Sequence, residues 1–305
     1  MKREILREDI PRIRELFHQV TREADFAALE RMGGLTNHTY KVTGNKSGEF
    51  VVRIPGEGTE ELIVRGDEEI HTRLACDLGI DAELLHFGKD GSKVTIYIPG
   101  AVTMSPETMK EEENVRSAAE IFRTLHRCGV DTGVPFDVFE MAAGYELFLH
   151  KKGVGLYEDY PQIKEKVMQI KADMDSVRKP ERVPCHNDPL CENWIRGTDR
   201  MYLIDWEYAG MNDGMWDLAD LSIEAGYGDE QDECLLRCYL GGEPADIDRK
   251  AFWANKLYLD YLWTLWGKTR VPFDGRPMED YAAERYVRLK ENLARFQNLK
   301  GENDR

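Results

Sequence analysis

The fold of this chain is decided by two stretches, residues 186–193 (HNDPLCEN) and residues 203–207 (LIDWE). Asp188 and Asn193 lie five positions apart in the first stretch, and Asp205 in the second stretch follows Asn193 by twelve positions. Any one of these residues alone is more often an ordinary loop residue or strand cap than part of a site. Their joint spacing indicates one site built from two carboxylates and an amide.

A β-hairpin is predicted to connect the two stretches. Val183, Ile195 and residues 201–204 supply its short apolar runs, and the polar residues 197–200 (GTDR) supply its turn. The amide is therefore expected at the start of the hairpin and the second carboxylate just after its end.

This inventory is the one that phosphoryl transfer from a magnesium–nucleotide complex requires. One carboxylate accepts the proton of the attacking hydroxyl, while an amide oxygen and a second carboxylate hold the metal ions that bridge the phosphates. The kinase catalytic loop has the form His-x-Asp-x4-Asn, and a metal-binding aspartate follows on a hairpin. His186, Asp188, Asn193 and Asp205 fit this form, so the motif indicates a kinase.

The chain resembles the choline/ethanolamine kinase branch of the aminoglycoside-phosphotransferase and choline-kinase superfamily, from about Gly33 to about Lys268. Within this branch it looks most like the bacterial choline kinases that prepare phosphocholine for surface decoration. The resemblance implies an α+β, bilobal protein-kinase-like fold that uses ATP and Mg2+. Residues 1–100 would form a nucleotide-binding lobe with a helical prelude, a small antiparallel sheet and one helix. Residues 101–305 would form a larger, mostly helical lobe for catalysis and acceptor binding.

The composition limits the class of partner. Hydrophobic residues make up 42% of the chain and charged residues 32%, as in globular proteins, and the net charge is -16. Such an acidic chain is not expected to bind nucleic acid, whereas it would attract a cationic small molecule. Together with the resemblance, this indicates a small-molecule substrate, choline or a related amino alcohol.

Neither a membrane nor an oxidising compartment is indicated. Residues 1–9 lack the apolar core of a signal peptide, and no stretch is apolar over the length of a membrane span. The six cysteines form no Cys-x2-Cys pair, and Cys234 and Cys238, one helical turn apart, suggest packing more than metal binding. We therefore expect a cytoplasmic protein with reduced thiols.

Hydrophobic periodicity and turn residues predict the order of elements. Strands are expected at residues 36–43, 49–54, 83–87 and 93–98, a helix at 60–78, and the crossover between lobes at 100–104. Further helices are expected at residues 106–128, 140–151, 161–178, 216–226, 229–240, 246–268 and 277–298. Residues 1–30 indicate only a helical prelude.

A glycine-rich turn before the first expected strand is a candidate phosphate-binding loop. Paired glycines, Gly33 and Gly34, let a backbone turn approach phosphates closely, and Thr36 and Asn37 could add donors. A Gly-Gly pair before a strand is usually only a turn. Its position matches that of the nucleotide loop in the resembled family.

Arg53 occupies the strand on which kinases place a phosphate-contacting cation, and its planar fork suits phosphate oxygens. A helix carboxylate should orient it; Glu68 is the candidate, with Glu69 as the alternative. Tyr97 and Ile98 resemble the hinge that meets adenine through backbone groups.

The acceptor pocket is expected after the second stretch. In the resembled family, residues at the positions of Tyr208 and Glu224 line the choline site, and the residue matching Asp217 supports the catalytic loop. Trp263 and Trp266, three apart on a helix, match a tryptophan pair that walls the quaternary-ammonium pocket. A trimethylammonium group is held by aromatic faces and nearby carboxylates, which fits this composition.

The resulting mechanism gives each motif residue a role. Asp188 orients the acceptor hydroxyl and accepts its proton, while Asn193 and Asp205 bind Mg2+. Glu207 helps to bind the metal through water, and His186 braces the loop.

Three alternative activities stay open. Ethanolamine is the nearest rival substrate, because a primary ammonium prefers carboxylates and hydrogen bonds. An aminoglycoside kinase would need an open acidic cleft, and a non-catalytic choline-binding scaffold would not need the complete motif seen here. Two departures are notable: Leu190 stands where eukaryotic choline kinases usually carry glutamine, and Asp-Trp-Glu replaces the Asp-Phe-Gly of protein kinases.

Overall fold

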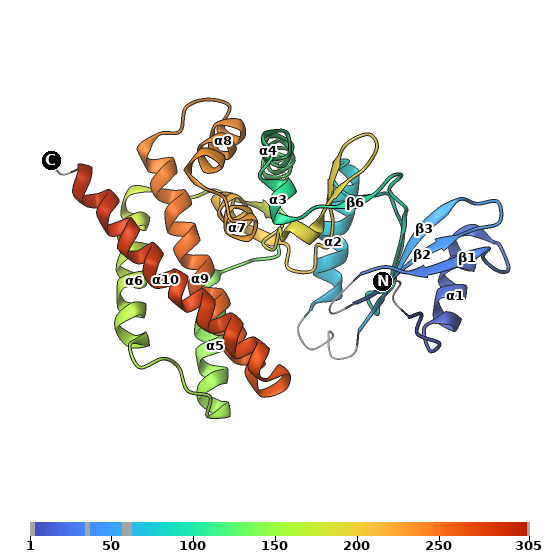
Figure 1. The fold of residues 1–305 in the computed structure, drawn as a ribbon, viewed down its shortest axis with the longest axis horizontal. Helices are drawn as coiled ribbons and strands as arrows, with labels where there is room; N and C mark the ends of the chain where they lie inside the picture. Colours follow the sequence, from blue (N-terminus) through green and yellow to red (C-terminus); the bar gives the residue numbers. More distant parts are fainter. Residues whose placement is uncertain (1–3, 34–36, 57–62, 304–305) are drawn as a thin grey trace. The chain divides into compact units, whose positions relative to one another are not determined.

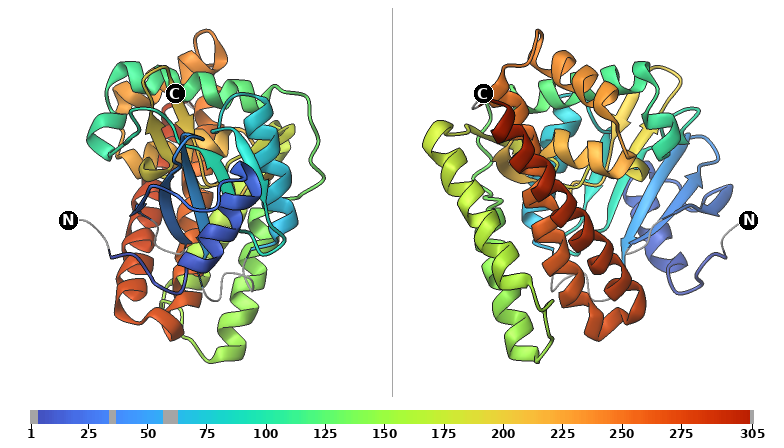
Figure 2. Two further views of the ribbon diagram at one scale, coloured as in Figure 1. Left: turned by 90° about the vertical axis from the view of Figure 1, so that its right-hand side faces the viewer. Right: turned by 60° about the vertical axis from the view of Figure 1, so that its left-hand side comes forward.

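The computed structural model describes residues 4–33, 37–56 and 63–303, with side chains as far as Phe296 (Figures 1 and 2). Its helices and strands are, in chain order, α1 (Ile10–Thr21), β1 (Ala28–Arg31), β2 (Asn37–Thr43), β3 (Glu49–Pro55), α2 (Arg65–Asp77), β4 (Leu84–Phe87), β5 (Lys93–Ile96), β6 (Val102–Thr103), α3 (Pro106–Met109), α4 (Glu112–His126), α5 (Val138–Lys152), α6 (Tyr160–Val177), β7 (Arg182–Cys185), the 3-10 turn η2 (Cys191–Asn193), β8 (Trp194–Arg196), β9 (Met201–Leu203), β10 (Gly210–Asp213), α7 (Met215–Ala225), α8 (Asp229–Leu240), α9 (Asp246–Asp274) and α10 (Arg276–Asn303).

The chain divides into two compact units. The first contains Met1–Met109 and Asp188–Gly210, and the second contains Lys110–Asn187 and Met211–Arg305. This division differs from the expected single boundary after residue 100. The reason is that β6 pairs with β8, so the expected crossover and the hairpin form one sheet of the first unit.

A five-stranded antiparallel sheet with the order β1-β2-β3-β5-β4 forms the main part of the first unit. The four expected strands are present, and β1 is an additional edge strand that pairs with β2. The helix α1 contributes Ile13, Leu16 and Phe17 to a buried cluster with Tyr40 and Val42 of β2. The helical prelude expected within residues 1–30 is thus present as α1, and it supplies three of the eight buried residues of this cluster.

The predicted hairpin is present as β8 and β9. Its register pairs Ile195 with Tyr202, and both side chains are buried in a second cluster with Ala82 and Ile98. Val183 was expected in this hairpin, and that expectation was wrong. The residue lies in β7, which pairs with β10.

The second unit is mostly helical, as expected, and also contains the two-stranded pair of β7 and β10. The two longest described helices, α9 and α10, are joined by a sharp turn at Gly275 and pack side by side. The helices α5 and α7 also pack against α9 (Figures 1 and 2). The helix expected at residues 106–128 is interrupted between α3 and α4, because Glu111 has an extended backbone (φ -64°, ψ 131°). Gly226 and Gly241 adopt positive φ and end α7 and α8, which fixes the two helices at their expected lengths.

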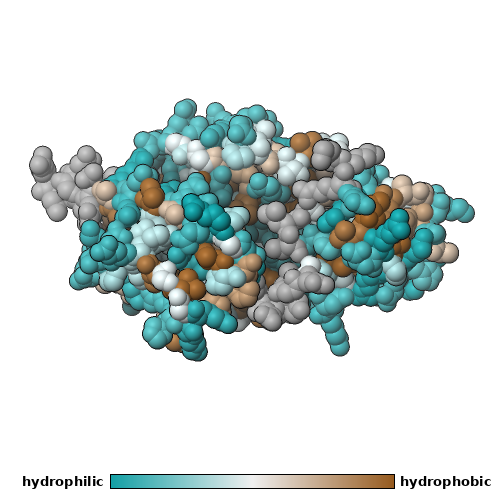
Figure 3. All heavy atoms as spheres, turned by 60° about the horizontal axis from the view of Figure 1, so that its bottom comes forward, coloured by the Kyte–Doolittle hydropathy of each residue, from teal (hydrophilic) through white to brown (hydrophobic). Residues whose placement is uncertain are grey.

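Polar side chains predominate on the face drawn in Figure 3, where apolar residues are scattered. Within the described residues, no helix combines the length and the apolar character needed to cross a membrane.

Candidate functional site

Arg53 of β3 is the buried centre of a charge cluster in the first unit. Its side chain forms an ion pair with Glu68 of α2, and its Nη1 donates a hydrogen bond to Asp205 Oδ1 at 3.1 Å. The neighbouring Glu69 faces away and pairs with Arg73 Nη2 at 2.7 Å. Of the two glutamates considered for orienting Arg53, the structure places Glu68 in contact with it.

Carboxylates keep the Arg53 guanidinium charged in this buried position. Burial alone would lower the pKa of Arg53, but Glu68, Asp205 and Glu207 outweigh this effect and raise it. Arg53 Nε is buried and has no hydrogen-bond partner among the described residues. The side chain thus has one donor that the described protein groups do not use.

Glu207 lies beside the same cluster. Asn37 Nδ2 donates to Glu207 Oε2 at 3.3 Å, and Arg65 Nη1 lies 3.8 Å from that oxygen. Burial and then the charge of Asp205 raise the pKa of Glu207 to about 7, while Arg53 opposes this rise. Asn37, predicted in the phosphate loop, is therefore tied to a predicted metal-binding carboxylate.

The loop and the hairpin hold the other motif residues in register. Asn193 Nδ2 donates to the backbone oxygen of Asp188 at 2.9 Å. The backbone N–H of Ile204 donates to the backbone oxygen of Asn193 at 2.9 Å, which places Asp205 close to Asn193. Asp205 has a left-handed backbone (φ 71°), unusual for a residue with a side chain. Asp188, Asn193 and Asp205 are thus brought together as the spacing predicted.

A second aspartate anchors the start of the loop in the second unit. The carboxylate of Asp217, fully buried on α7, accepts the backbone N–H groups of His186 and Asn187 at 2.8 Å each. His126 Nε2 lies 3.0 Å from Asp217 Oδ2, and Tyr239 in turn lies 3.0 Å from His126 Nδ1. Because a buried carboxylate needs such partners, this network fixes both the aspartate and the loop backbone.

An aromatic cluster in the second unit contains the predicted tryptophans. Trp263 and Trp266 of α9 meet edge to face with ring centroids 5.7 Å apart, and Tyr281 of α10 meets Trp266 in the same way at 5.8 Å. Glu224 at the end of α7 forms an ion pair with Arg285, whose guanidinium lies 5.0 Å from the Tyr281 ring centroid. The predicted carboxylate therefore has an internal cation beside aromatic rings.

Arg285 is held between two acidic residues. Its side chain is 7% exposed, and its Nη1 lies 3.6 Å from Asp260, which also accepts hydrogen bonds from Arg288. Burial would lower the pKa of Arg285, but Glu224, Tyr281 and Asp260 more than compensate and raise it. The guanidinium is therefore a permanent charge of this cluster.

The remaining predicted residues differ in their surroundings. Tyr208 is a half-buried residue of the first unit. Tyr97 N–H is bonded to Glu49 O at 3.0 Å within the sheet, and the carbonyl of Ile98 accepts from Ala101 N at 3.1 Å. A Cβ at Gly33 would meet no described atom within 4 Å. Gly34 and Thr36, the other two predicted residues of the phosphate loop, lie outside the described residues.

Several residues that contact the site were not predicted from the sequence. Gly91 accepts a hydrogen bond from Arg53 Nη2 at 2.9 Å, and its positive φ (85°) belongs to the turn between β4 and β5. A side chain at Gly91 would also clash with Arg65. The Asp90-Gly91 pair was a readable turn signal, but Tyr281 and Arg285 carried no local signal, because their partners lie on other helices.

Comparisons with known proteins identify the family of this chain. The sequence profile of the choline/ethanolamine kinase family matches residues 29–261. A crystal structure of a choline/ethanolamine kinase family protein from Mesorhizobium loti has 34% identity and a TM-score of 0.83, covering 95% of this chain and 98% of that one. The structure of choline kinase LicA from Streptococcus pneumoniae has 29% identity and a TM-score of 0.79, over 94% and 99% of the two chains. Protein LicA of Haemophilus influenzae is 28% identical over 89% of this chain and 80% of its own length.

These matches extend over both compact units and include the catalytic loop and the hairpin. They confirm the expected α+β, protein-kinase-like fold. The chain is therefore a kinase that belongs to the choline/ethanolamine kinase family.

Proposed function

We propose that this protein transfers the terminal phosphoryl group of ATP to the hydroxyl of choline, giving phosphocholine and ADP. The observation that carries the choice of choline is the aromatic cluster of Trp263, Trp266 and Tyr281. A trimethylammonium group has no N–H to donate, so aromatic faces are its best partners, at about 2 kcal/mol for a desolvated contact.

The state of Glu224 supports the same choice. Arg285 is already paired with this carboxylate, so Glu224 has less hydrogen-bonding capacity left for a ligand. Ethanolamine would need such acceptors for its primary ammonium, whereas choline needs mainly charge and aromatic surface. Ethanolamine stays the second candidate, because Glu224 is still a carboxylate beside these rings, and the family includes kinases of both substrates.

The motif residues supply the chemistry in this proposal. Asp188 orients the choline hydroxyl and accepts its proton. Asn193 and Asp205 offer the oxygen ligands that Mg2+ prefers, and the Asp205 side chain is 33% exposed, so these residues fit the ion. Bound there, Mg2+ would neutralise phosphate charge, and Glu207 would assist through water. Tyr208 would join Glu224 and the two tryptophans in binding the acceptor.

The nucleotide would use the first unit. The unused donor of Arg53 fits a phosphate oxygen, and Glu68 holds the guanidinium in place. The turn formed by Gly33, Gly34, Thr36 and Asn37 would cover the phosphates, and the backbone of Tyr97 and Ile98 would meet adenine.

Initial rates of ADP release with Mg-ATP and separate additions of choline, ethanolamine and kanamycin test the proposal. We expect choline to give the highest kcat/KM, and Asp188→Asn to abolish turnover while Mg-ATP still binds in a calorimetric titration. Turnover with another acceptor alone would refute the choline assignment. Near-normal activity of Asp188→Asn would refute the proposed base, and absence of Mg-ATP binding by the wild type would favour a non-catalytic scaffold.

A further inference from the structure

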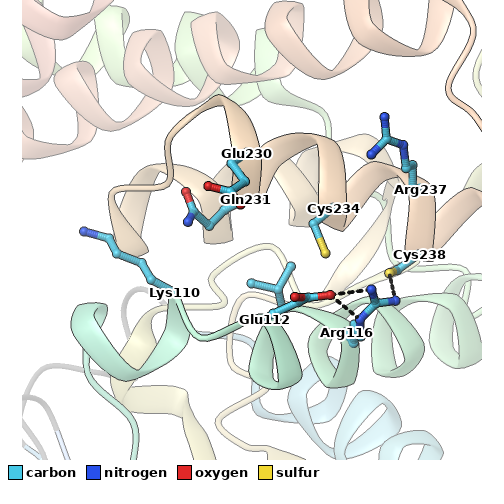
Figure 4. Close-up of a pocket in the computed structure, with 9 residues that line it drawn as sticks. Lys110, Glu112, Arg116, Glu230, Gln231, Cys234, Arg237 and Cys238 are labelled. Carbon is cyan, nitrogen blue, oxygen red and sulfur yellow. Dashed lines mark hydrogen bonds and ion pairs between the residues drawn. The ribbon is translucent and has the colours of Figure 1, made fainter.

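A hollow of about 250 Å³ lies in the second unit between α4 and α8, and none of the residues that line it belongs to the candidate functional site (Figure 4). Cys234 and Cys238 of α8 direct their sulfur atoms toward α4 in this hollow. Three cationic side chains also line it, those of Lys110, Arg116 and Arg237. Two carboxylates, those of Glu112 and Glu230, line it as well, so the hollow combines two half-buried thiols with a small excess of positive charge.

Arg116 forms a hydrogen bond with one of the two thiols. Its Nη1 donates to Cys238 Sγ at 3.4 Å, while its Nε is bonded to Glu112 at 3.0 Å, which fixes the direction of the guanidinium. A cation beside a cysteine stabilises the thiolate, which is the nucleophilic form. Burial and the adjacent Cys238 raise the pKa of Cys234, although Arg116 opposes this rise. Cys238 is thus the thiol of this pair that is prepared for reaction.

The other cysteines are less suited. Cys185 and Cys191 are 0% and 2% exposed. Cys76 donates its S–H to the backbone oxygen of Ala82 at 2.9 Å, and burial raises its pKa to about 12. Cys128 is half-buried, like Cys238, and lies outside the hollow, so it serves as a natural control.

We propose that Cys238 is a modification site that exchanges with small disulfides bearing carboxylate groups. The Cys238 thiolate attacks one sulfur of the disulfide, a new S–S bond forms, the old S–S bond breaks, and the other half leaves as a thiolate. Lys110 and Arg237 line the same hollow; Arg237 Nε already pairs with Glu243 at 2.9 Å, so Lys110 would be the main attraction for the carboxylates of such a reagent. Charge complementarity therefore favours an acidic disulfide over a basic one.

The helix geometry predicts that the mixed disulfide persists. Cβ atoms four residues apart on a helix are about 5–6 Å apart, whereas a disulfide needs about 3.5–4.5 Å. Cys234 therefore cannot displace the adduct by forming an intrahelical bond unless α8 unwinds. The product is one added group on Cys238.

An adduct at this position would also act on the loop anchor. Arg123 of α4 donates to the backbone oxygen of Cys238, and Arg127, which follows α4, donates to that of Tyr239, so this end of α8 lies directly on α4. Tyr239 contacts His126, which contacts Asp217, the anchor of the loop backbone. We expect a group wedged between α4 and α8 to weaken this chain of contacts and lower turnover, a consequence that rests on the proposed function.

The experiment uses the reduced full-length protein, treated with oxidised glutathione or with the basic disulfide cystamine and followed by intact mass and peptide mapping. We expect one glutathionyl group on Cys238, none there in Cys238→Ser, and normal labelling of this site in Cys128→Ser. Arg116→Gln should react about threefold more slowly, since the contact is exposed to solvent. The ratio of Cys238 to Cys128 labelling should be higher for glutathione than for cystamine.

Three results would overturn the proposal. They are faster labelling of wild type at Cys128 or Cys234 than at Cys238, formation of an internal disulfide, and an equal ratio of Cys238 to Cys128 labelling for both reagents. Peptide mapping of the wild type decides the site even where a variant folds poorly. Choline-dependent ADP release, measured before and after labelling and again after reduction, tests the coupling to the loop. The mass readout does not depend on the activity, so a failure of the proposed function and a failure of the site are distinguishable.

Discussion

Replacing Arg285 by methionine should change the preference between choline and ethanolamine. The substitution keeps a long side chain against Tyr281 but removes the cation paired with Glu224. Glu224 then has free lone pairs beside the aromatic cluster. A primary ammonium can use them and a trimethylammonium cannot, so ethanolamine should gain relative to choline.

The size of the effect follows from the contacts. A hydrogen bond to a charged group contributes about 1.5–3 kcal/mol, and 1.4 kcal/mol corresponds to a tenfold ratio. We therefore expect the ratio of kcat/KM for ethanolamine over choline to rise about tenfold. Removing one partner of a buried ion pair costs roughly 3–5 kcal/mol of stability. The loss should lie near the lower end, because Glu224 is 19% exposed and Asp260 keeps its hydrogen bonds from Arg288 and Asn292.

The assay compares wild type with Arg285→Met, Arg285→Lys and Glu224→Gln, using ADP release with each acceptor and urea unfolding of each protein. Arg285→Lys retains the charge, so its ratio should stay near that of wild type. Glu224→Gln should lower the ratio, because the carboxylate is gone. A folded Arg285→Met variant that loses both activities equally would refute the reasoning and leave Arg285 with a structural role only.

Two further aspartates allow separate tests. Burial raises the pKa of Asp81 from 3.8 to about 6, although a hydrogen bond from Trp206 opposes this rise. At a pH between these two pKa values, Asp81 is deprotonated in the unfolded chain and protonated in the folded protein. Unfolding free energy should therefore fall by up to about 3 kcal/mol as pH rises from about 4 to 6, and Asp81→Asn should flatten this slope in urea titrations, whereas an unchanged slope would assign it to other groups. Asp217→Asn keeps the shape but replaces one acceptor of the loop backbone by a donor, costing about 1–3 kcal/mol. We expect kcat for choline to fall with little change in the affinity for ATP, and a loss of ATP affinity instead would contradict the anchoring role.

Local patterns in the sequence predicted most of the elements. Alternation over β2 and β3, helical spacing over α2, and the glycines that end α7 and α8 each act within a few residues, so their signals can be read without knowledge of the fold. The motif spacing predicted the neighbourhood of Asn193 and Asp205 for a related reason. A short hairpin leaves few ways to connect them.

Contacts between distant segments could not be predicted in the same way. The core role of α1 depends on Tyr40 and Val42 of β2, which are separated from it in the chain by β1. Arg285 looks like any other charged residue of a polar helix until α7 and α9 supply Glu224 and Asp260. Its function is created by packing, and a single sequence contains no local trace of that packing.

The aspartates of this protein show why a motif alone cannot assign roles. Asp217 is fully buried and uses its oxygens on backbone N–H groups, so it serves as an anchor. Asp81 is equally buried beside an indole, and its raised pKa makes it a neutral group in mild acid. Asp205 is partly exposed beside Arg53 and Asp188 is half-buried in the loop, which suits the ligand and base roles proposed for them. The same carboxyl group thus serves as an anchor or a neutral group, and in the proposed mechanism as a ligand or a base, according to burial and charge, which only the folded chain determines.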